Sequence, residues 1–215
     1  MKKFLLLVMA LAALSVSAKT DEAKMNKFID NLMSKMTLQE KLGQLNLPVS
    51  GEIVTGSTKS SDVAEKIKKG QVGGLFNLKG VDKIREVQEI AVKQSRLGIP
   101  LFFGMDVVHG YETVFPIPLA LSMSWDMDAI RNSAHIAAVE STADGISWTF
   151  SPMVDICRDP RWGRMAEGDG EDPYLGSQIA KAKEEDYQGT DLTAPNTMMA
   201  CVKHSAHYGA PEAGR

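Results

Sequence analysis

Hydrophobic residues recur every three or four positions in several stretches of this chain, which is the spacing of amphipathic helices. Over 25–36 the apolar stripe is rich in methionine and is expected to pack in a core. Thr37 and Glu40 form a capping box that starts the next helix. The Asp-Pro pair at 172–173 begins a later helix that Gly189 ends. Helices are expected over 25–36, 38–45, from 62, 81–97, 126–142 and 173–188.

Four short runs of continuous apolar residues alternate with these helices. Continuous apolar strands are typical of a parallel sheet that is covered on both faces, and the strand–helix–strand order predicts crossover units. The strands are expected at 72–76, 101–105, 148–154 and 198–202. Polar residues gather just beyond the strand ends: Asn77, Asp106, His109, Asp155, Lys203 and His204.

The loops that follow several of these strands favour a (β/α) barrel over an open doubly wound sheet. An open sheet would also bind ligands at its strand ends, but no Gly-x-Gly-x-x-Gly or phosphate loop follows any strand here. Pro116 and Pro118 make 107–123 an irregular connection. Four strand–helix units are clear, whereas a closed barrel has eight in about 250 residues. We therefore expect an α/β fold, an incomplete (β/α)8 TIM-type barrel truncated after about four to five strand–helix units.

The first 18 residues have the features of a secretory signal peptide. Lys2 and Lys3 precede an apolar run that is too short to span a membrane, and small residues end at Ala18. We expect an exported protein, periplasmic or secreted, with 19–215 as the mature part. The chain of 215 residues has a formal net charge of −3 and loses two lysines with the signal. Nucleic acid and, after signal removal, a membrane are therefore not expected partners.

Cysteine and histidine spacing gives no metal motif. Cys157 and Cys201 are too few for a disulfide framework, and we expect two unpaired thiols. His204 and His207 could share a metal, but no third ligand stands at a matching spacing. No metal and no cofactor are expected.

The run from Cys157 to Arg164 is the most informative stretch for function, because it holds three arginines, an aspartate and a tryptophan in eight residues. Forked donors, carboxylate acceptors and an aromatic face suit a pocket for a neutral, hydroxyl-rich ring. The alternative is a surface loop with ion pairs. Glu167, three residues after Arg164, is expected to form a salt bridge that holds this loop.

The residues after the strands have more than one possible role. Asp106 could accept hydrogen bonds from hydroxyls, act as an acid or base, or cap a turn. Lys203 could donate to substrate oxygens with His204 beside it, or form a Schiff base. Asp106 and Asp155 are one conceivable carboxylate pair for a glycosidase. His109 could be catalytic or structural, and His135 is expected to be structural.

Seven ordered blocks resemble glycoside hydrolase family 3, and more closely its branch of exported bacterial β-glucosidases and β-xylosidases. The likeness runs from about Met25 to the end of the chain. The blocks are Gly-Met-Asp-Val-Val-His-Gly (104–110), Thr-Val-Phe-Pro-Ile-Pro-Leu-Ala-Leu (113–121), Ser-Trp-Asp (124–126), Phe-Ser-Pro-Met-Val-Asp (150–155), Arg-Asp-Pro-Arg-Trp-Gly-Arg (158–164), Gly-Glu-Asp-Pro-Tyr-Leu-Gly (170–176) and Val-Lys-His (202–204).

This resemblance implies a retaining, exo-acting hydrolase that removes a terminal β-linked glucose or xylose from glucosides or oligosaccharides. Asp106, Arg164, Lys203 and His204 would hold hydroxyls of that sugar. The nucleophilic aspartate and the acid/base carboxylate would come from the remainder of the barrel and a second domain, beyond residue 215. No residue of this chain is then assigned a catalytic role, and the chain alone is expected to bind sugar weakly and to hydrolyse nothing.

Two departures from the family pattern stand near the site. Asp169 occupies a position that is often aromatic, and Ser205 with His207 replaces apolar residues after the Lys-His pair. The N-acetylhexosaminidase branch is disfavoured because its Lys-His-Phe-Pro-Gly-His-Gly loop is not matched. Two other functions remain open: a Schiff-base aldolase barrel that uses Lys203, and a non-catalytic sugar-binding module.

Overall fold

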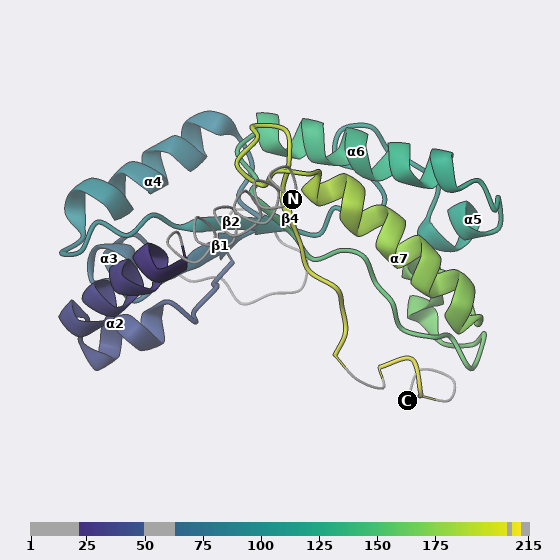
Figure 1. Cartoon of the computed structure of the whole chain (residues 1–215), viewed down its shortest axis with the longest axis horizontal. Helices are drawn as coiled ribbons and strands as arrows, with labels where there is room; N and C mark the ends of the chain where they lie inside the picture. Colours follow the sequence, from purple (N-terminus) through teal and green to yellow (C-terminus); the bar gives the residue numbers. More distant parts are fainter. Residues whose placement is uncertain (1–21, 50–62, 206–207, 212–215) are drawn as a thin grey trace, which may run out of the picture.

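The structure is a computed structural model that describes residues 22–49, 63–205 and 208–211. The expected signal peptide, most of the loop expected over 46–60, and His207 lie outside the described residues. A helix over 22–35 precedes the other elements, most of which are labelled in Figure 1. These are α2 (Leu38–Gly43), α3 (Val63–Lys68), β1 (Gly74–Phe76), α4 (Val81–Gln94), β2 (Phe102–Met105), α5 (Pro118–Ser122), α6 (Met127–Ala143), β3 (Trp148–Thr149), the 3-10 helix η1 (Gly163–Glu167), α7 (Pro173–Gln188) and β4 (Met199–Ala200).

The four strands form one parallel sheet in the order β1-β2-β3-β4. Gly74 pairs with Phe102, Gly104 with Trp148, and Trp148 with Met199. Each strand is thus followed in the sheet by the next strand in sequence, with a helical crossover between them. The sheet is not closed within the part of the chain described, so the fold is the partial α/β barrel that the sequence predicts.

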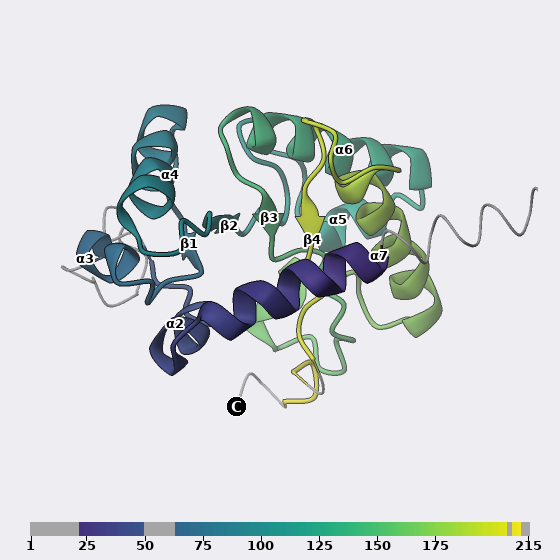
Figure 2. The same ribbon diagram turned by 60° about the vertical axis from the view of Figure 1, so that its left-hand side comes forward.

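Helices α4, α6 and α7 cover the sheet (Figures 1 and 2) and bury their apolar faces against it. Apart from Ile130, the buried positions of α6 are small, among them Ala134, Ala137 and Ala138, and α7 runs alongside this helix. Asp126 and Asp172 accept the first free amides of α6 and α7, so both helices begin where the sequence predicts.

Several expected elements are shorter than the apolar runs that predicted them. The helix from Val81 ends at Gln94, and the last two strands contain two residues each. Ser151 and Pro152 follow β3, and a proline has no amide to continue the ladder. Pairing resumes as one bridge between Met153 and Lys203. Inside the expected irregular connection, Pro118 starts the short helix α5 as its first residue.

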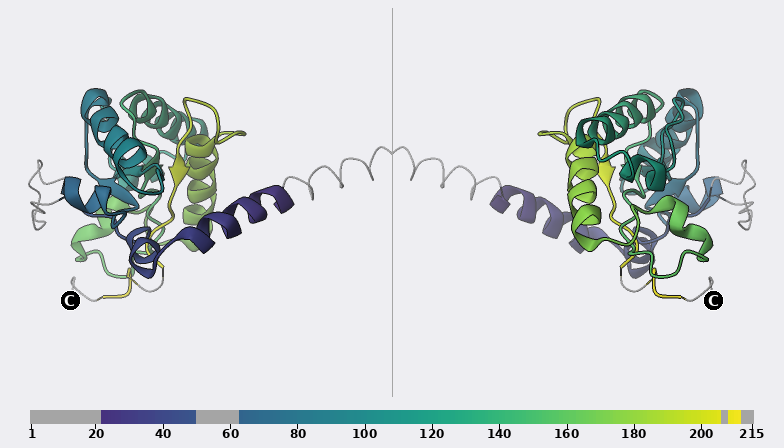
Figure 3. Two further views of the ribbon diagram at one scale, coloured as in Figure 1. Left: turned by 90° about the vertical axis from the view of Figure 1, so that its left-hand side faces the viewer. Right: turned by 90° about the vertical axis from the view of Figure 1, so that its right-hand side faces the viewer.

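The methionine-rich stripe over 25–36 does not pack in the core, so that prediction is wrong for this structure. The helix over 22–35 projects away from the sheet and the other helices (Figure 3). Phe28 is 67% exposed and Met33 43%, and of the stripe residues only Met36 is buried. No helix of the described residues is both long and apolar enough to cross a membrane.

Candidate functional site

Two residues that stand almost a hundred positions apart meet at the carboxyl edge of the sheet. Asp106 follows β2 directly, and Lys203 follows β4. Lys203 Nζ donates to Asp106 Oδ1 at 2.5 Å. The carboxyl ends of parallel strands lie at one edge of a sheet, so the fold places these side chains within reach of each other.

Arg164 reaches the same edge from η1, where Glu167 holds it in a two-bond fork. Arg164 Nε and Nη2 donate to the two Glu167 oxygens at 2.5 and 2.7 Å. Glu167 Oε2 also lies 3.8 Å from Lys203 Nζ, so one carboxylate ties the arginine to the lysine. The hydrogen bonds from Arg164 lower the pKa of Glu167, and the same bonds raise the pKa of Arg164. The salt bridge expected between these two residues is present.

His204 is oriented by a buried carboxylate. Its backbone amide donates to Asp155 Oδ2 at 3.1 Å, and its Nδ1 lies 2.7 Å from the same oxygen. A proton on Nδ1 satisfies Asp155 and leaves Nε2, which lies 3.4 Å from Arg164 Nη1, as an acceptor for the guanidinium. Asp155 is therefore occupied in holding His204, and its pairing with Asp106 as two free carboxylates finds no support in this geometry.

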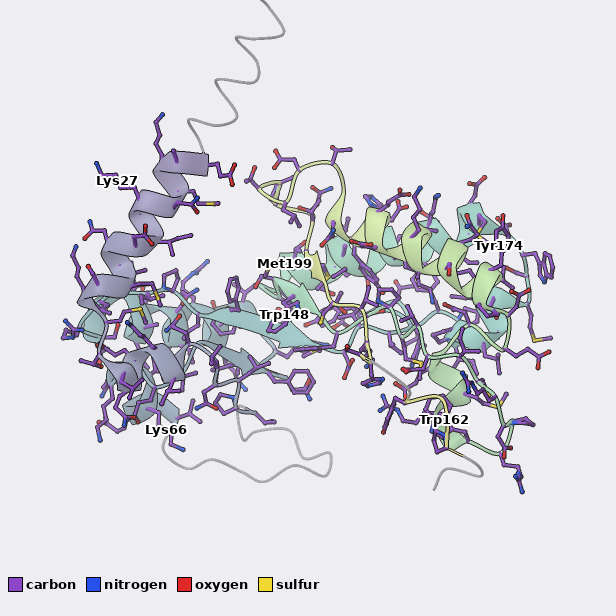
Figure 4. All side chains as sticks on the ribbon, turned by 60° about the horizontal axis from the view of Figure 1, so that its bottom comes forward. Lys27, Lys66, Trp148, Trp162, Tyr174 and Met199 are labelled. Carbon is purple, nitrogen blue, oxygen red and sulfur yellow. The ribbon has the colours of Figure 1, made fainter. Side chains whose placement is uncertain are left out.

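An aromatic side chain that was not among the predicted binding residues completes the cluster. The ring centroid of Tyr208 lies 4.4 Å from that of His204 and 5.1 Å from the guanidinium carbon of Arg164. Trp162 packs edge-on against Tyr208 at 5.7 Å, close to the segment after β4 (Figure 4). Tyr208 stands five residues after Lys203 in the block that follows β4, and this spacing is the only signal that could have indicated it.

One cluster thus contains the four predicted binding residues: Asp106, Arg164, Lys203 and His204. Their side chains differ in how far they are exposed to a ligand. The side chain of Asp106 is 46% exposed and that of Lys203 is 12% exposed. Arg164 and His204 are about one-third exposed. A hollow of about 190 Å³ borders the cluster and is lined in part by Asp155, Arg158 and His204.

Other candidates lie apart from this cluster. His109 and His135 are exposed. Cys157 and Cys201 are free thiols, as expected. No group of three metal-ligating side chains occurs among the residues described. A larger hollow, about 530 Å³, lies between α4 and α6 and is lined mainly by apolar and long charged side chains of α4.

The cluster combines fixed donors, carboxylate acceptors and aromatic rings over a short stretch of the sheet edge. Ionised Arg and Lys donate strongly, Asp106 accepts, and the rings offer flat apolar faces. This set matches the alternating hydroxyls and C–H faces of a sugar ring. Together with a parallel α/β sheet whose polar residues follow the strands, it is the arrangement expected of a barrel-type enzyme domain, in which the site lies at the carboxyl ends of the strands.

Comparison with known proteins identifies the family. The model described as Glycosyl hydrolase family 3 N terminal domain matches residues 37–214, and the chain belongs to this family. The periplasmic beta-glucosidase of Salmonella typhimurium is 44% identical over 196 residues, which are 91% of this chain and 25% of that protein. The lysosomal beta glucosidase of Dictyostelium discoideum is 29% identical, over 87% of this chain and 26% of its own length.

Solved structures of similar fold are also beta-glucosidases and a related beta-glucanase. A beta-glucosidase from Listeria innocua in complex with isofagomine has a TM-score of 0.77 and 42% identity, and the match covers 87% of this chain and 27% of that one. An exo-1,3/1,4-beta-glucanase from a Pseudoalteromonas species has a TM-score of 0.74 at 29% identity, and the match covers 87% of this chain and 25% of that one. The chain therefore spans about a quarter of the length of the relatives it matches.

Proposed function

We propose that this chain supplies the sugar-holding half of the active site of a retaining, exo-acting β-glycosidase that removes terminal β-linked glucose or xylose. The observation that carries the proposal is the joined cluster of Asp106, Arg164, Lys203 and His204 at the carboxyl edge of the sheet. The β-glucosidases and β-xylosidases among the relatives support the substrate class.

Each residue has a role that follows from its chemistry. Asp106 accepts hydrogen bonds from hydroxyls of the terminal sugar, while Lys203 and Arg164 donate to their oxygens. The contacts of Lys203 with Asp106, and of Arg164 with Glu167, hold these groups in place before the sugar arrives. Preorganised contacts of this kind position the ring and strengthen as it flattens toward an oxocarbenium-like transition state.

The proposal assigns the two catalytic carboxylates to parts of the protein outside this chain. The chain spans about a quarter of its relatives, so the remainder of the barrel and a second domain are proposed to complete the site. We also propose that the protein is exported and works in the periplasm or outside the cell. The lysine-apolar start of the sequence and the periplasmic Salmonella relative support this location.

A Schiff-base aldolase is less well supported by the geometry. A nucleophilic lysine must present a neutral amine, and enzymes usually provide it in an apolar pocket or beside another cation. Lys203 lies between two carboxylates, Asp106 and Glu167, at 2.5 and 3.8 Å. These neighbours suit an ammonium ion that donates hydrogen bonds.

Sugar binding by the purified chain tests the proposal. Calorimetry with glucose and cellobiose is expected to give weak binding that Asp106→Asn lowers and that Asp128→Asn, an exposed carboxylate on α6, leaves unchanged. No turnover of an aryl β-glucoside by this chain is expected, whereas the protein made from the whole reading frame should hydrolyse it. Turnover by the chain alone would contradict the assignment of the catalytic carboxylates elsewhere.

A further inference from the structure

A buried ion pair outside the cluster connects α7 to the loop that carries Arg164. Lys183 Nζ donates to Asp169 Oδ1 at 3.1 Å, and the two side chains are only 4% and 3% exposed. The second oxygen of Asp169, Oδ2, is buried with no hydrogen-bond partner among the described residues. Burial raises the pKa of Asp169, and the charge of Lys183 opposes that rise.

Stability alone does not account for this pair. Removing two charges from water is costly, and apolar side chains of similar volume often replace a buried ion pair without loss of stability. One carboxylate oxygen here also stays without a partner among the described residues, which adds to that cost. What a buried pair does provide is a single geometry, because any other arrangement leaves both charges unpaired in the interior.

The position of Asp169 determines what that geometry fixes. Asp169 stands two residues after Glu167, whose two oxygens hold Arg164. The next residue, Gly170, accepts the amide of Cys157 at 3.1 Å, so the loop is closed at this point. The ion pair therefore fastens the carboxyl end of η1 to the middle of α7.

The same buried face of α7 also holds the other side of the cluster. Tyr187, one turn after Lys183, donates from its hydroxyl to the carbonyl of Val107 at 2.9 Å and lies 3.3 Å from Ser151 Oγ. Val107 directly follows Asp106. Two buried polar side chains of α7 thus contact both sides of the cluster: Tyr187 bonds the backbone beside Asp106, and Lys183 bonds the side chain of Asp169, two residues after Glu167.

We propose that Asp169 and Lys183 are positioning residues for the glycosidase site, a role that rests on the proposed function. They act on substrate through Glu167 and Arg164, and they contact no sugar themselves. Their ion pair keeps the η1 loop against α7, so that the Arg164 guanidinium stands beside His204 and faces the same space as Asp106 and Lys203.

The test uses the protein made from the whole reading frame and the variant Asp169→Asn/Lys183→Met. This variant removes the tether and leaves no unpaired charge. Lys181→Met is the matched control, because Lys181 lies on the same helix with its side chain 69% exposed, 3.8 Å from Glu185. Two quantities are measured: amide hydrogen exchange of 163–170, and kcat/KM for an aryl β-glucoside at a temperature where every variant is folded.

The expected result is exchange about tenfold faster in 163–170 and a loss of kcat/KM of about tenfold, with neither change in Lys181→Met. The loss is expected to be non-additive with Arg164→Lys, because both changes act through the same guanidinium. Lys183→Arg alone, which keeps both charges but changes the geometry of their pair, should show smaller changes of both kinds and serves if the neutral pair does not fold.

Unchanged exchange in 163–170 would overturn the proposal, as would faster exchange with kcat/KM within twofold of the unmodified protein, roughly the limit of such a comparison. If the loss of kcat/KM in the Asp169→Asn/Lys183→Met variant simply adds to the loss in Arg164→Lys, the ion pair has a general structural role and does not act through Arg164. If the unmodified protein hydrolyses no β-glycoside, the proposed function fails. The exchange measurement then still reports whether the pair orders the loop, so the two failures are distinguishable.

Discussion

Arg164→Lys is the substitution for which the structure gives the sharpest expectation. Arg164 makes two charged hydrogen bonds to Glu167, at 2.5 and 2.7 Å, and contacts His204 and the ring of Tyr208. Lysine keeps the charge but cannot form a planar fork, so Glu167 loses a donor and the aromatic contact is lost. Hydrogen bonds to charged groups contribute about 1.5–3 kcal/mol. The residues are about one-third exposed, so the lower end applies, about 1.5 kcal/mol.

A loss of about 1.5 kcal/mol corresponds to roughly tenfold in an equilibrium or rate constant. We expect kcat/KM for an aryl β-glucoside to fall by about that factor in the protein made from the whole reading frame. Arg161→Lys is the control, because Arg161 forms a similar fork with Asp159 but its side chain is 69% exposed and outside the cluster. Equal losses in the two variants, or no loss in Arg164→Lys, would refute the reasoning.

Three further predictions concern the chain itself. Hydrogen bonds from Arg164 hold the pKa of Glu167 below its ordinary 4.5, so its ionised form stabilises the fold above that pH and this contribution disappears as pH falls through the lower folded value. Urea unfolding should therefore show Glu167→Gln less stable at pH 7, with the difference shrinking below pH 4.5. Asp126→Ala removes the cap of α6 and should cost about 1 kcal/mol by the same assay. Gly209→Ala places a Cβ 2.3 Å from the Ile156 carbonyl oxygen, so the segment after β4 must shift. Calorimetry should then show weaker sugar binding. Unchanged binding would show that this segment does not shape the site.

Much of the fold could be predicted because most local signals, the methionine-rich stripe over 25–36 excepted, agree with burial in the structure. The apolar run that became β2 is continuous, and polar Asp106 marks its end within one residue. The Asp172-Pro173 pair located the start of α7 to the residue, and the helix expected from 126 begins at Met127, one residue later, after its cap Asp126. Strand ends after β3 and β4 could not be located, because 150–154 and 201–202 remain largely apolar, and keep some backbone hydrogen bonds to each other, after the regular strands end.

The four proposed binding residues could be named from the sequence, but the contacts that each one makes could not. Because Asp106 and Lys203 follow parallel strands, both were expected at the carboxyl edge of the sheet. In the structure Lys203 Nζ lies 2.5 Å from Asp106 Oδ1. Sequence could not show that Asp155 turns inward to hold His204, because a carboxylate after a strand looks the same whether buried or exposed. The Asp169–Lys183 pair could not be predicted either, because an ion pair between a loop and a helix follows no regular spacing in the sequence.

We propose that Asp106, Arg164, Lys203 and His204 face one sugar-sized space. A crystal structure of the protein made from the whole reading frame, soaked with glucose, would show whether they do. Our account predicts a glucose ring whose hydroxyls lie within hydrogen-bond distance of Asp106 and Lys203, with Arg164 and His204 beside them. A glucose bound at another face, with these four side chains contacting only one another, would contradict it.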